Sequence, residues 1–226
     1  MKYKLIGFIK GFLLFSRIPL LLSFLRHPFQ FSANTMGLSK WIKKHGSAAK
    51  FNDFYVAKRN YDNRLKLFDF VAEQESLVTS EITYLEFGVY SGRSFQWWLS
   101  KNANPQSRFF GFDTFEGLPE GWLFFKKGDM KSETPTIEDG RGAFVKGLFQ
   151  HTLFPFLKEN GELLRRSKKV IHLDADLFSS TLFTLTTLAP FLNAGDIILF
   201  DEFNVPNHEF LAWELFCNSY YVNFEA

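Results

Sequence analysis

The stretch that decides the fold is Tyr84-Leu-Glu-Phe-Gly-Val-Tyr-Ser-Gly-Arg-Ser94. A short apolar run, Ile82 to Phe87, breaks at two glycines, Gly88 and Gly92, and a helical pattern follows. This order is typical of the first strand, turn and helix of a nucleotide-binding βαβ unit. The two glycines alone are a weak signal, because many such turns hold glycines only for packing. The case rests on the stretches that come later in the chain.

The turn residues suit a ligand that approaches the backbone closely. Gly88 has no Cβ and tolerates a positive φ. The first N–H groups of the helix that begins at Ser94 have no partner within the helix and face a ligand bound at the turn. The second strand, Ser107 to Phe112, ends at Asp113, about 20 residues after the glycines, where a carboxylate accepts hydrogen bonds from both ribose hydroxyls. The alternative is that Asp113 caps the turn after it, and we favour the ribose role.

Composition narrows the class of protein. The chain has 226 residues, of which 46% are hydrophobic and 22% charged, so it is globular and long enough for one α/β domain with an appendage. The net charge of +2 and the absence of a basic run between stacking aromatics argue against a nucleic-acid partner. The single cysteine, Cys217, excludes an intrachain disulfide and a multi-cysteine zinc site, and it fits a reducing, cytoplasmic setting.

Two further strands each end in a pair of carboxylates. The strand from Lys169 to Leu173 is followed by Asp174-Ala-Asp176, and the strand from Asp196 to Phe200 is followed by Asp201-Glu202. The carboxyl ends of parallel strands form the ligand edge of an open sheet, so we expect these side chains to converge. Carboxylates that converge repel one another unless a cation lies among them. We therefore predict a Mg²⁺ site formed by Asp174, Asp201 and Glu202.

A bland interpretation of these acids stays open. One of them caps a helix, another pairs with a lysine or arginine, and no metal binds. After Asp176 a helix is predicted, with Ser179, Ser180 or Thr181 as its cap.

The segment between the second and third strands is polar and has no period. Residues 120–143 are predicted to form a surface loop that serves as a lid on the substrate side. The third strand is predicted over Phe144 to Phe149, and His151 is expected to lie in a solvent-facing loop.

The amino-terminal segment differs from the rest. Leu5 to Leu25 is almost wholly apolar, but Lys10 and Arg17 interrupt it and Pro19 bends it, so it is a poor spanning helix. Its basic and aromatic composition favours an amphipathic helix on the inner surface of an anionic membrane, through residues 1–26. A helix packed on its own domain or across a dimer is equally consistent with the pattern.

These observations predict three regions: an apolar, basic helical arm at 1–30, a connector at 31–62, and a catalytic domain at 63–226. The domain begins with a helix whose apolar face is Leu65, Phe68, Val71 and Ala72, capped by Asp62 or Asn63.

The motifs together resemble the class I S-adenosylmethionine-dependent methyltransferases, and within them the macrocin and mycinamicin sugar O-methyltransferases. The resemblance covers about residues 60–217, and five stretches carry it: Leu85-Glu-Phe-Gly-Val-Tyr-Ser-Gly92, Gly111-Phe-Asp-Thr-Phe-Glu-Gly-Leu-Pro119, Val145-Lys-Gly-Leu-Phe149, His172-Leu-Asp-Ala-Asp-Leu-Phe-Ser-Ser-Thr181 and Leu199-Phe-Asp-Glu-Phe203. It implies a Rossmann-like α/β sheet with helices on both faces. The implied activity is transfer of a methyl group from S-adenosylmethionine to a hydroxyl of a sugar, glycan or natural product, assisted by Mg²⁺.

The resemblance also assigns roles to residues. The implied cofactor site consists of Glu86, Gly88, Tyr90, Gly92, Ser94, Asp113, Thr114, Phe149 and Asp174. Asp174, Asp201 and Glu202 match the Mg²⁺ ligands of that family, and Asp176 matches its proposed general base. One departure is Glu202, because the antibiotic enzymes carry a second aspartate there.

A second departure concerns the end of the sheet. Tyr220 to Phe224 is predicted to be a sixth strand, and no residues follow Ala226 to form the seventh, so we expect a sheet shortened at its last hairpin. That exposed edge and the apolar arm both favour a homodimer. Two other functions stay open: an NAD-dependent oxidoreductase, which Tyr90 in place of a motif glycine disfavours, and a catalytically inactive methyltransferase-like binding protein.

Overall fold

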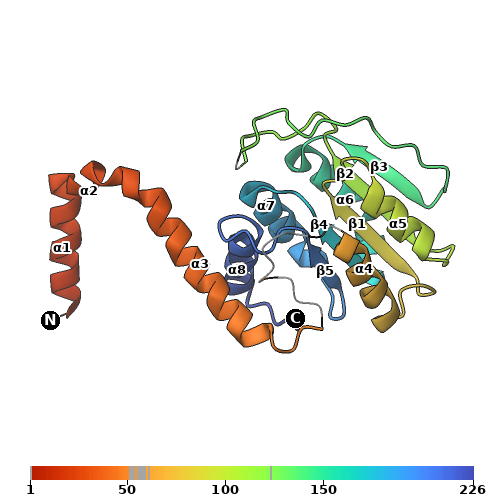
Figure 1. Cartoon of the computed structure of the whole chain (residues 1–226), viewed down its shortest axis with the longest axis horizontal. Helices are drawn as coiled ribbons and strands as arrows, with labels where there is room; N and C mark the ends of the chain where they lie inside the picture. Colours follow the sequence, from red (N-terminus) through yellow and green to blue (C-terminus); the bar gives the residue numbers. More distant parts are fainter. Residues whose placement is uncertain (1, 51–53, 55–59, 61, 123) are drawn as a thin grey trace.

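The computed structural model describes the chain except for residues 1, 51–53, 55–59, 61 and 123. A five-stranded sheet with helices on both faces forms the domain (Figure 1). The strands are β1 (Ile82–Phe87), β2 (Arg108–Asp113), β3 (Gly142–Lys146), β4 (Lys168–Leu173) and β5 (Ile197–Phe200). They are all parallel and lie in the order β3-β2-β1-β4-β5, so the predicted Rossmann-like class is confirmed.

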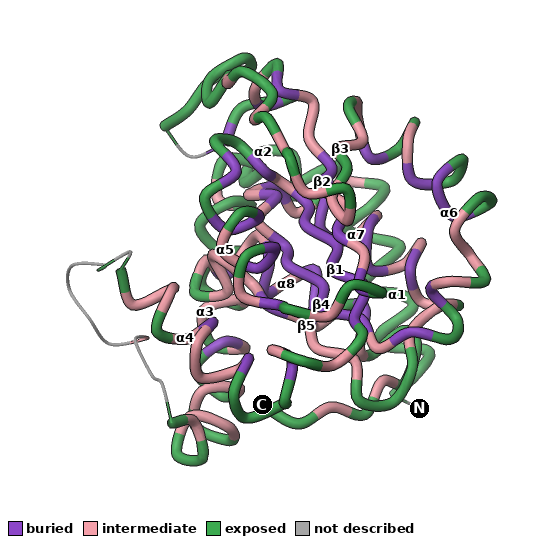
Figure 2. The backbone as a smooth tube through the Cα atoms, turned by 90° about the vertical axis from the view of Figure 1, so that its right-hand side faces the viewer, coloured by how far each residue is buried: buried purple, intermediate pink, exposed green. Residues whose placement is uncertain are grey.

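β1 lies at the centre of the sheet, and every one of its residues is buried. Its register places Glu86 beside Gly111 of β2 and beside His172 of β4. In Figure 2 the buried part of the chain is concentrated in these central strands. The glycine turn after β1 therefore opens at the middle of the ligand edge of the sheet.

Alternate residues of β1 pack on opposite faces. Ile82 and Tyr84 pack in one cluster with Phe68 of α4 (Asp62–Gln74) and with Trp98 of α5 (Arg93–Lys101). The opposite face, from Leu85 and Phe87, packs against α6 (Phe149–Arg166), α7 (Phe178–Leu188) and α8 (Glu209–Tyr220); the short 3₁₀ helix η2 (Ala189–Phe191) follows α7. α4 thus covers one face of the sheet with its apolar side, as predicted.

Three local predictions are wrong. β3 ends at Lys146, and Phe149 begins α6 instead of ending a strand, because Gly147, with φ of +139°, turns the chain out of the sheet. His151 consequently lies in a helix, although its side chain is exposed. Residues 220–224 form no strand: α8 ends at Tyr220, and Phe224 packs on Trp213 with ring centroids 5.0 Å apart.

The predicted cap of α7 is also wrong, and the residue directly before α4 lies outside the described residues. The residue before α7 is Leu177, which has no polar side chain to cap the helix. Ser179, Ser180 and Thr181, the predicted caps, lie inside the helix. At the start of α4 the side chain of Asn60 accepts a hydrogen bond from the backbone N–H of Asp62, at 3.0 Å. The sequence pattern located both helices, but the capping side chain depends on the path of the preceding loop.

The amino-terminal arm comprises α1 (Lys2–Ser16), α2 (Ile18–Leu21), the 3₁₀ helix η1 (Ser23–Leu25) and α3 (Arg26–His45), and it extends away from the domain (Figure 1). α3 continues through residue 30, so the predicted boundary between arm and connector falls inside a helix. Part of the predicted connector lies outside the described residues. Within those that are described, no helix is both long and apolar enough to cross a membrane.

Candidate active site

A cavity of about 660 Å³ lies at the carboxyl ends of the central strands. Its walls contain all but one of the residues predicted to bind the cofactor, together with the predicted base and metal ligands. Those lining residues are Glu86, Gly88, Tyr90, Ser94, Asp113, Thr114, Phe149, Asp174, Asp176, Asp201 and Glu202. Gly92 is the exception. The size suits a small molecule, which typically occupies a cleft of 300–1,000 Å³.

The glycine turn is shaped by the protein's own backbone. Gly88 has φ of +96°, and a Cβ added there would lie 1.8 Å from the carbonyl oxygen of Asp174. Gly92, with φ of +76°, is the residue before α5, and a Cβ there would lie 2.9 Å from Pro135. The positive φ predicted at Gly88 is confirmed, but the group that approaches its backbone closely is the loop after β4.

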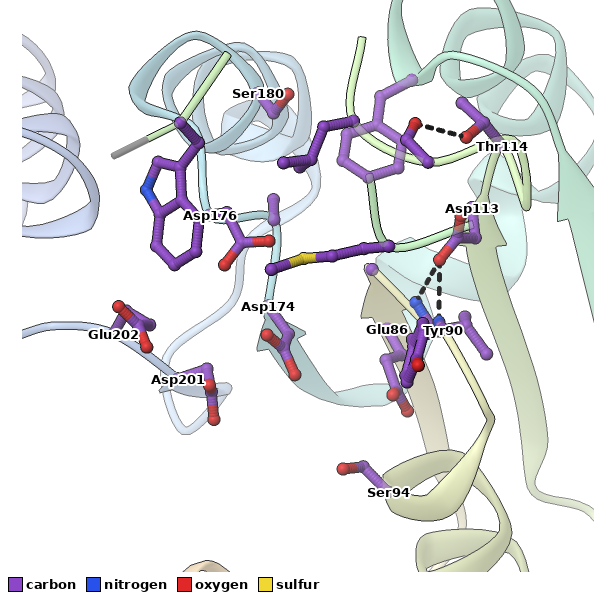
Figure 3. A pocket seen from close by; sticks show the side chains of 18 of the residues that line it. Glu86, Tyr90, Ser94, Asp113, Thr114, Asp174, Asp176, Ser180, Asp201 and Glu202 are labelled. Carbon is purple, nitrogen blue, oxygen red and sulfur yellow. Dashed lines mark hydrogen bonds between the residues drawn. The ribbon is translucent and has the colours of Figure 1, made fainter. Parts of the chain in front are cut away.

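Asp113 holds this turn in place. Its Oδ2 accepts hydrogen bonds from the backbone N–H groups of Val89 and Tyr90, both at 2.8 Å, and its Oδ1 accepts one from Phe115 at 2.7 Å (Figure 3). The carboxylate therefore caps the following turn and also braces the glycine turn. Carboxylate oxygens have lone pairs left for ribose hydroxyls, so the ribose role stays a prediction. Thr114 lies beside it and donates its hydroxyl to the carbonyl of Gly117 at 3.1 Å.

Glu86 is a buried acid at the centre of the sheet. Its Oε2 accepts a hydrogen bond from the Tyr84 hydroxyl at 2.7 Å, and burial raises the pKa of its carboxyl to about 8. The Tyr84 hydroxyl also lies 3.2 Å from Nδ1 of His172, whose pKa burial lowers to about 3. The imidazole is therefore neutral, and Glu86 is largely protonated at neutral pH until a cation arrives.

The acids after β4 and β5 converge, as predicted, around an arginine. Arg64 of α4 lies with its Nη1 atom 3.3 Å from Oδ2 of Asp174, and its Nη2 atom pairs with Asp201. Burial raises the pKa of Asp174 well above its usual value, and the neighbouring Asp201 adds to the effect. The alternative in which an acid at a strand end pairs with an arginine is therefore observed for Asp174 and Asp201. Sequence spacing could not reveal Arg64, because it lies 110 positions before Asp174.

Asp176 and Glu202 also line the cavity. Burial, followed by the charge of Glu202, raises the pKa of Asp176 to about 7. In Figure 3 Asp174, Asp176, Asp201 and Glu202 lie on the same side of the pocket, with Glu202 next to Asp201. Asp176 has φ of +57°, an uncommon backbone conformation for a residue other than glycine.

One buried acid escaped the sequence reasoning. Glu209, at the start of α8, is fully buried, and its Oε2 accepts a hydrogen bond from the backbone N–H of Glu202 at 2.8 Å. Burial raises its pKa well above the usual value. The sequence signal for Glu209 is that it is an acid seven residues after Glu202, in the segment that follows the same strand. Glu209 fixes the loop that carries both acids.

The segment predicted to be a lid contributes to the cavity wall. Trp122, Phe125 and Met130 line the cavity, and Trp122 is buried with Leu118 and Leu177. Trp122 and Phe125 stack with ring centroids 5.5 Å apart. The segment thus covers the site with aromatic side chains, although its composition is mostly polar.

The donor set suits a cation, with one competitor. His172, Asp174 and Asp201 each offer one ligand atom, and these atoms lie within 4.8 Å of one another. Glu202 is outside that group, so the structure assembles two of the three predicted metal ligands. Two carboxylates fit a hard divalent cation. The guanidinium of Arg64 now neutralises the same pair, so an ion would compete with it. Glu86 and Asp174 both line the cavity, where a positively charged ligand such as a sulfonium would stabilise their ionised forms.

Comparisons with known proteins agree with this geometry. Residues 85–203 match the family model described as a methyltransferase domain. The solved structure of CalS11, calicheamicin methyltransferase, superposes with a TM-score of 0.56 at 20% identity, over 81% of this chain and 83% of that one. The apo structure of CalS11, TDP-rhamnose 3'-O-methyltransferase, gives 0.51 at 21% identity, over 81% and 84%. No curated protein matches the sequence. The chain belongs to the methyltransferase family, and it is a class I S-adenosylmethionine-dependent methyltransferase.

Proposed function

We propose that this enzyme transfers a methyl group to a hydroxyl oxygen of a sugar or glycan. The observation that carries the proposal is Asp176, a carboxylate in the cavity wall whose pKa of about 7 suits proton transfer at neutral pH. O-methylation needs such a base, because a sugar hydroxyl is a poor nucleophile until it loses its proton. The name of CalS11, a TDP-rhamnose 3'-O-methyltransferase, supports a sugar as the acceptor.

The residues divide the work as follows. S-adenosylmethionine, when bound, supplies a methyl group activated by a positive sulfonium. Asp113 and the glycine turn hold the nucleoside end, and Glu86 provides negative charge near the cation. Asp176 would accept the proton of the acceptor hydroxyl as that oxygen takes the methyl group from the sulfonium, which would leave as a neutral thioether. Trp122 and Phe125 exclude water from the acceptor side of the cavity.

The predicted Mg²⁺ has a defined place in this proposal. Asp174 and Asp201 would hold the ion, and its charge would lower the pKa of an acceptor hydroxyl. Arg64 would have to leave the two carboxylates first, because its guanidinium pairs with both.

The test is a methyl-transfer assay with the full chain and S-adenosylmethionine. TDP-rhamnose, a panel of other nucleotide sugars, and a catechol serve as acceptors, and mass spectrometry detects an added methyl group. Methylation of a sugar, abolished in Asp176→Asn, supports the proposal. Methylation of the catechol alone would replace the sugar by a phenolic acceptor. Binding of S-adenosylhomocysteine with no methylation of any acceptor in the panel would favour the catalytically inactive binding protein.

A further inference from the structure

The amino-terminal arm presents an apolar surface to solvent. Neither α1 nor α2 contains a buried residue. Large side chains that would normally be buried are exposed from α1 to η1: Tyr3, Leu5, Ile6, Phe8, Ile9, Phe12, Leu13, Leu14, Phe15, Ile18, Leu20, Leu21, Leu22 and Phe24. Contiguous apolar patches of this kind on soluble proteins mark interaction sites.

The charge of the same region is of one sign. Every ionised side chain before Asp53 is a lysine or arginine, and five of these lie in or next to the apolar helices: Lys2, Lys4, Lys10, Arg17 and Arg26. Basic residues next to exposed aromatic and aliphatic side chains match an anionic lipid surface, whose headgroups attract the charges while its acyl region takes the apolar groups.

The backbone also fits a segment that lies along a surface. Arg17, with φ of +56°, separates α1 from α2, and Pro19 is in the first turn of α2. The break divides the apolar run into short helices. A short apolar helix enters the interface of a bilayer without crossing it.

The base of the arm is fixed to the catalytic domain. Leu38 of α3 is buried, and Asn34 donates a hydrogen bond to Asn207 at 2.9 Å. Trp41 packs on Phe203, the residue that directly follows Glu202, with ring centroids 4.7 Å apart. The free end of the arm therefore extends from a helix that is anchored beside the loop carrying the predicted metal ligands.

We propose that α1 and α2 dock this enzyme on the surface of an anionic phospholipid bilayer. A second copy of the chain is the less suitable occupant, because two such arms would bring together positive charges with no acidic residue in either arm to pair with them. A bilayer with anionic headgroups supplies both the counter-charge and the apolar phase. The proposal does not depend on which acceptor the cavity takes.

The experiment is co-sedimentation of the full chain with vesicles. One set contains phosphatidylcholine alone, and the other contains phosphatidylcholine with a quarter of phosphatidylglycerol. We expect binding to the anionic vesicles that is at least about tenfold tighter than to the neutral ones, and that weakens in about 0.5 M salt, where screening shortens the reach of surface charges. Equal binding to both sets, or binding to neither, would overturn the proposal.

Two arm variants and one matched control separate the contributions. Lys4→Gln/Lys10→Gln/Arg17→Gln should lose the preference for anionic vesicles. Phe8→Ser/Phe12→Ser/Phe15→Ser should lose binding altogether, and because these side chains are exposed, its thermal unfolding should match that of the wild type. The control Lys131→Gln/Lys158→Gln/Arg166→Gln removes the same charge from exposed sites on the domain and should bind normally.

Light scattering of the same variants decides between the two occupants. A monomeric wild type that binds anionic vesicles supports the proposal. A dimer that dissociates in the phenylalanine variant, together with no vesicle binding by the wild type, would assign the arm to a second copy instead.

Discussion

Arg64 of α4 places its Nη1 atom 3.3 Å from Oδ2 of Asp174, in the position where a metal ion would neutralise the same carboxylate. Its Nη2 atom pairs with Asp201 in the same way. An arginine and a divalent cation cannot both occupy the space between these two acids. The site therefore carries an internal counter-ion whose removal should change its affinity for metals.

The variant Arg64→Gln tests this competition. We expect it to bind Mn²⁺, a spectroscopic substitute for Mg²⁺, at least about tenfold more tightly than the wild type, because the two carboxylates lose a positive partner at close range. Electron paramagnetic resonance at pH 8 measures the free ion. Lys168→Gln, which removes a surface ion pair with Glu75, is the control and should leave the affinity unchanged. Equal Mn²⁺ affinity in wild type and Arg64→Gln would contradict the competition.

Asp176 should determine the pH dependence of turnover. Its pKa is raised to about 7, so the carboxylate that accepts the proton predominates only above that pH, and kcat should rise as the pH increases from 6 to 8. Asp176→Asn should lower kcat about 10²- to 10⁴-fold. The binding of S-adenosylhomocysteine, followed by calorimetry, should change little. A variant that keeps both its rate and its pH profile would show that Asp176 is not the base.

Glu86 should link cofactor binding to proton release. Its pKa is raised to about 8, so below that pH the free enzyme holds a proton that a positive sulfonium displaces. Affinity for S-adenosylmethionine should therefore increase from pH 6 to pH 8. Calorimetry in two buffers with different ionisation enthalpies should detect the released proton at pH 7. Glu86→Gln should abolish that release, whereas Glu81→Gln, at an exposed position before β1, should preserve it. Identical heats in the two buffers would argue against the linkage.

The same raised pKa has a consequence for stability. Folding moves the pKa of the Glu86 carboxyl upward, so the folded state binds the proton more tightly than the unfolded state. As the pH rises from the usual pKa of a glutamate towards about 8, the Glu86 carboxyl therefore lowers the stability of the fold. Urea unfolding of wild type and Glu86→Gln should show the difference in stability narrowing at acidic pH. A difference that is independent of pH would exclude the raised pKa.

Asp113→Ala should weaken two properties at once. The loss of its hydrogen bonds to Val89, Tyr90 and Phe115 releases the turn, and the ribose loses its predicted acceptor. We expect affinity for S-adenosylhomocysteine to fall at least about tenfold and the free energy of unfolding to fall by about 1–3 kcal/mol. Calorimetry and urea unfolding measure the two effects. Unchanged affinity in a destabilised variant would leave Asp113 a structural role alone.

Gly88→Ala should lower the free energy of unfolding. The new Cβ would collide with the carbonyl oxygen of Asp174, and φ of +96° is unfavourable for alanine, so we expect a loss of about 3 kcal/mol or more in urea unfolding. Gly140→Ala, at a position with open space around it, is the control and should change stability by no more than about 0.5 kcal/mol. A Gly88→Ala variant as stable as the control would show that the two loops separate easily.

Local signals in the sequence predicted most of the fold. The apolar run at 82–87 and the glycines after it located β1 and the turn, and acids after two other strands located the ligand edge. The errors arose where one pattern fits two structures. An apolar stretch such as 144–149 passes from strand to helix at Gly147, and the aromatic stretch 220–224 packs on α8 without strand pairing.

The candidate site was predictable where its residues follow strand ends and was not predictable where they arrive from elsewhere. Asp174, Asp176 and Asp201 follow β4 and β5, so topology alone brings them together. Arg64 comes from a helix before the sheet, and its ion pairs depend on how that helix packs. The position of Glu202, outside the group formed by His172, Asp174 and Asp201, likewise depends on the loop that Glu209 holds.

The contact between Gly88 and the carbonyl of Asp174 joins the turn expected to grip the cofactor to the loop that carries the acids. Because no side chain separates them, these two loops pack directly on each other, and we expect their spacing to be fixed. New acceptors would then be accommodated by changes elsewhere in the wall, where Trp122, Phe125 and Met130 line the cavity. Substitutions that change the acceptor should therefore occur at Trp122, Phe125 and Met130, whereas Gly88 and the loop at Asp174 should stay the same.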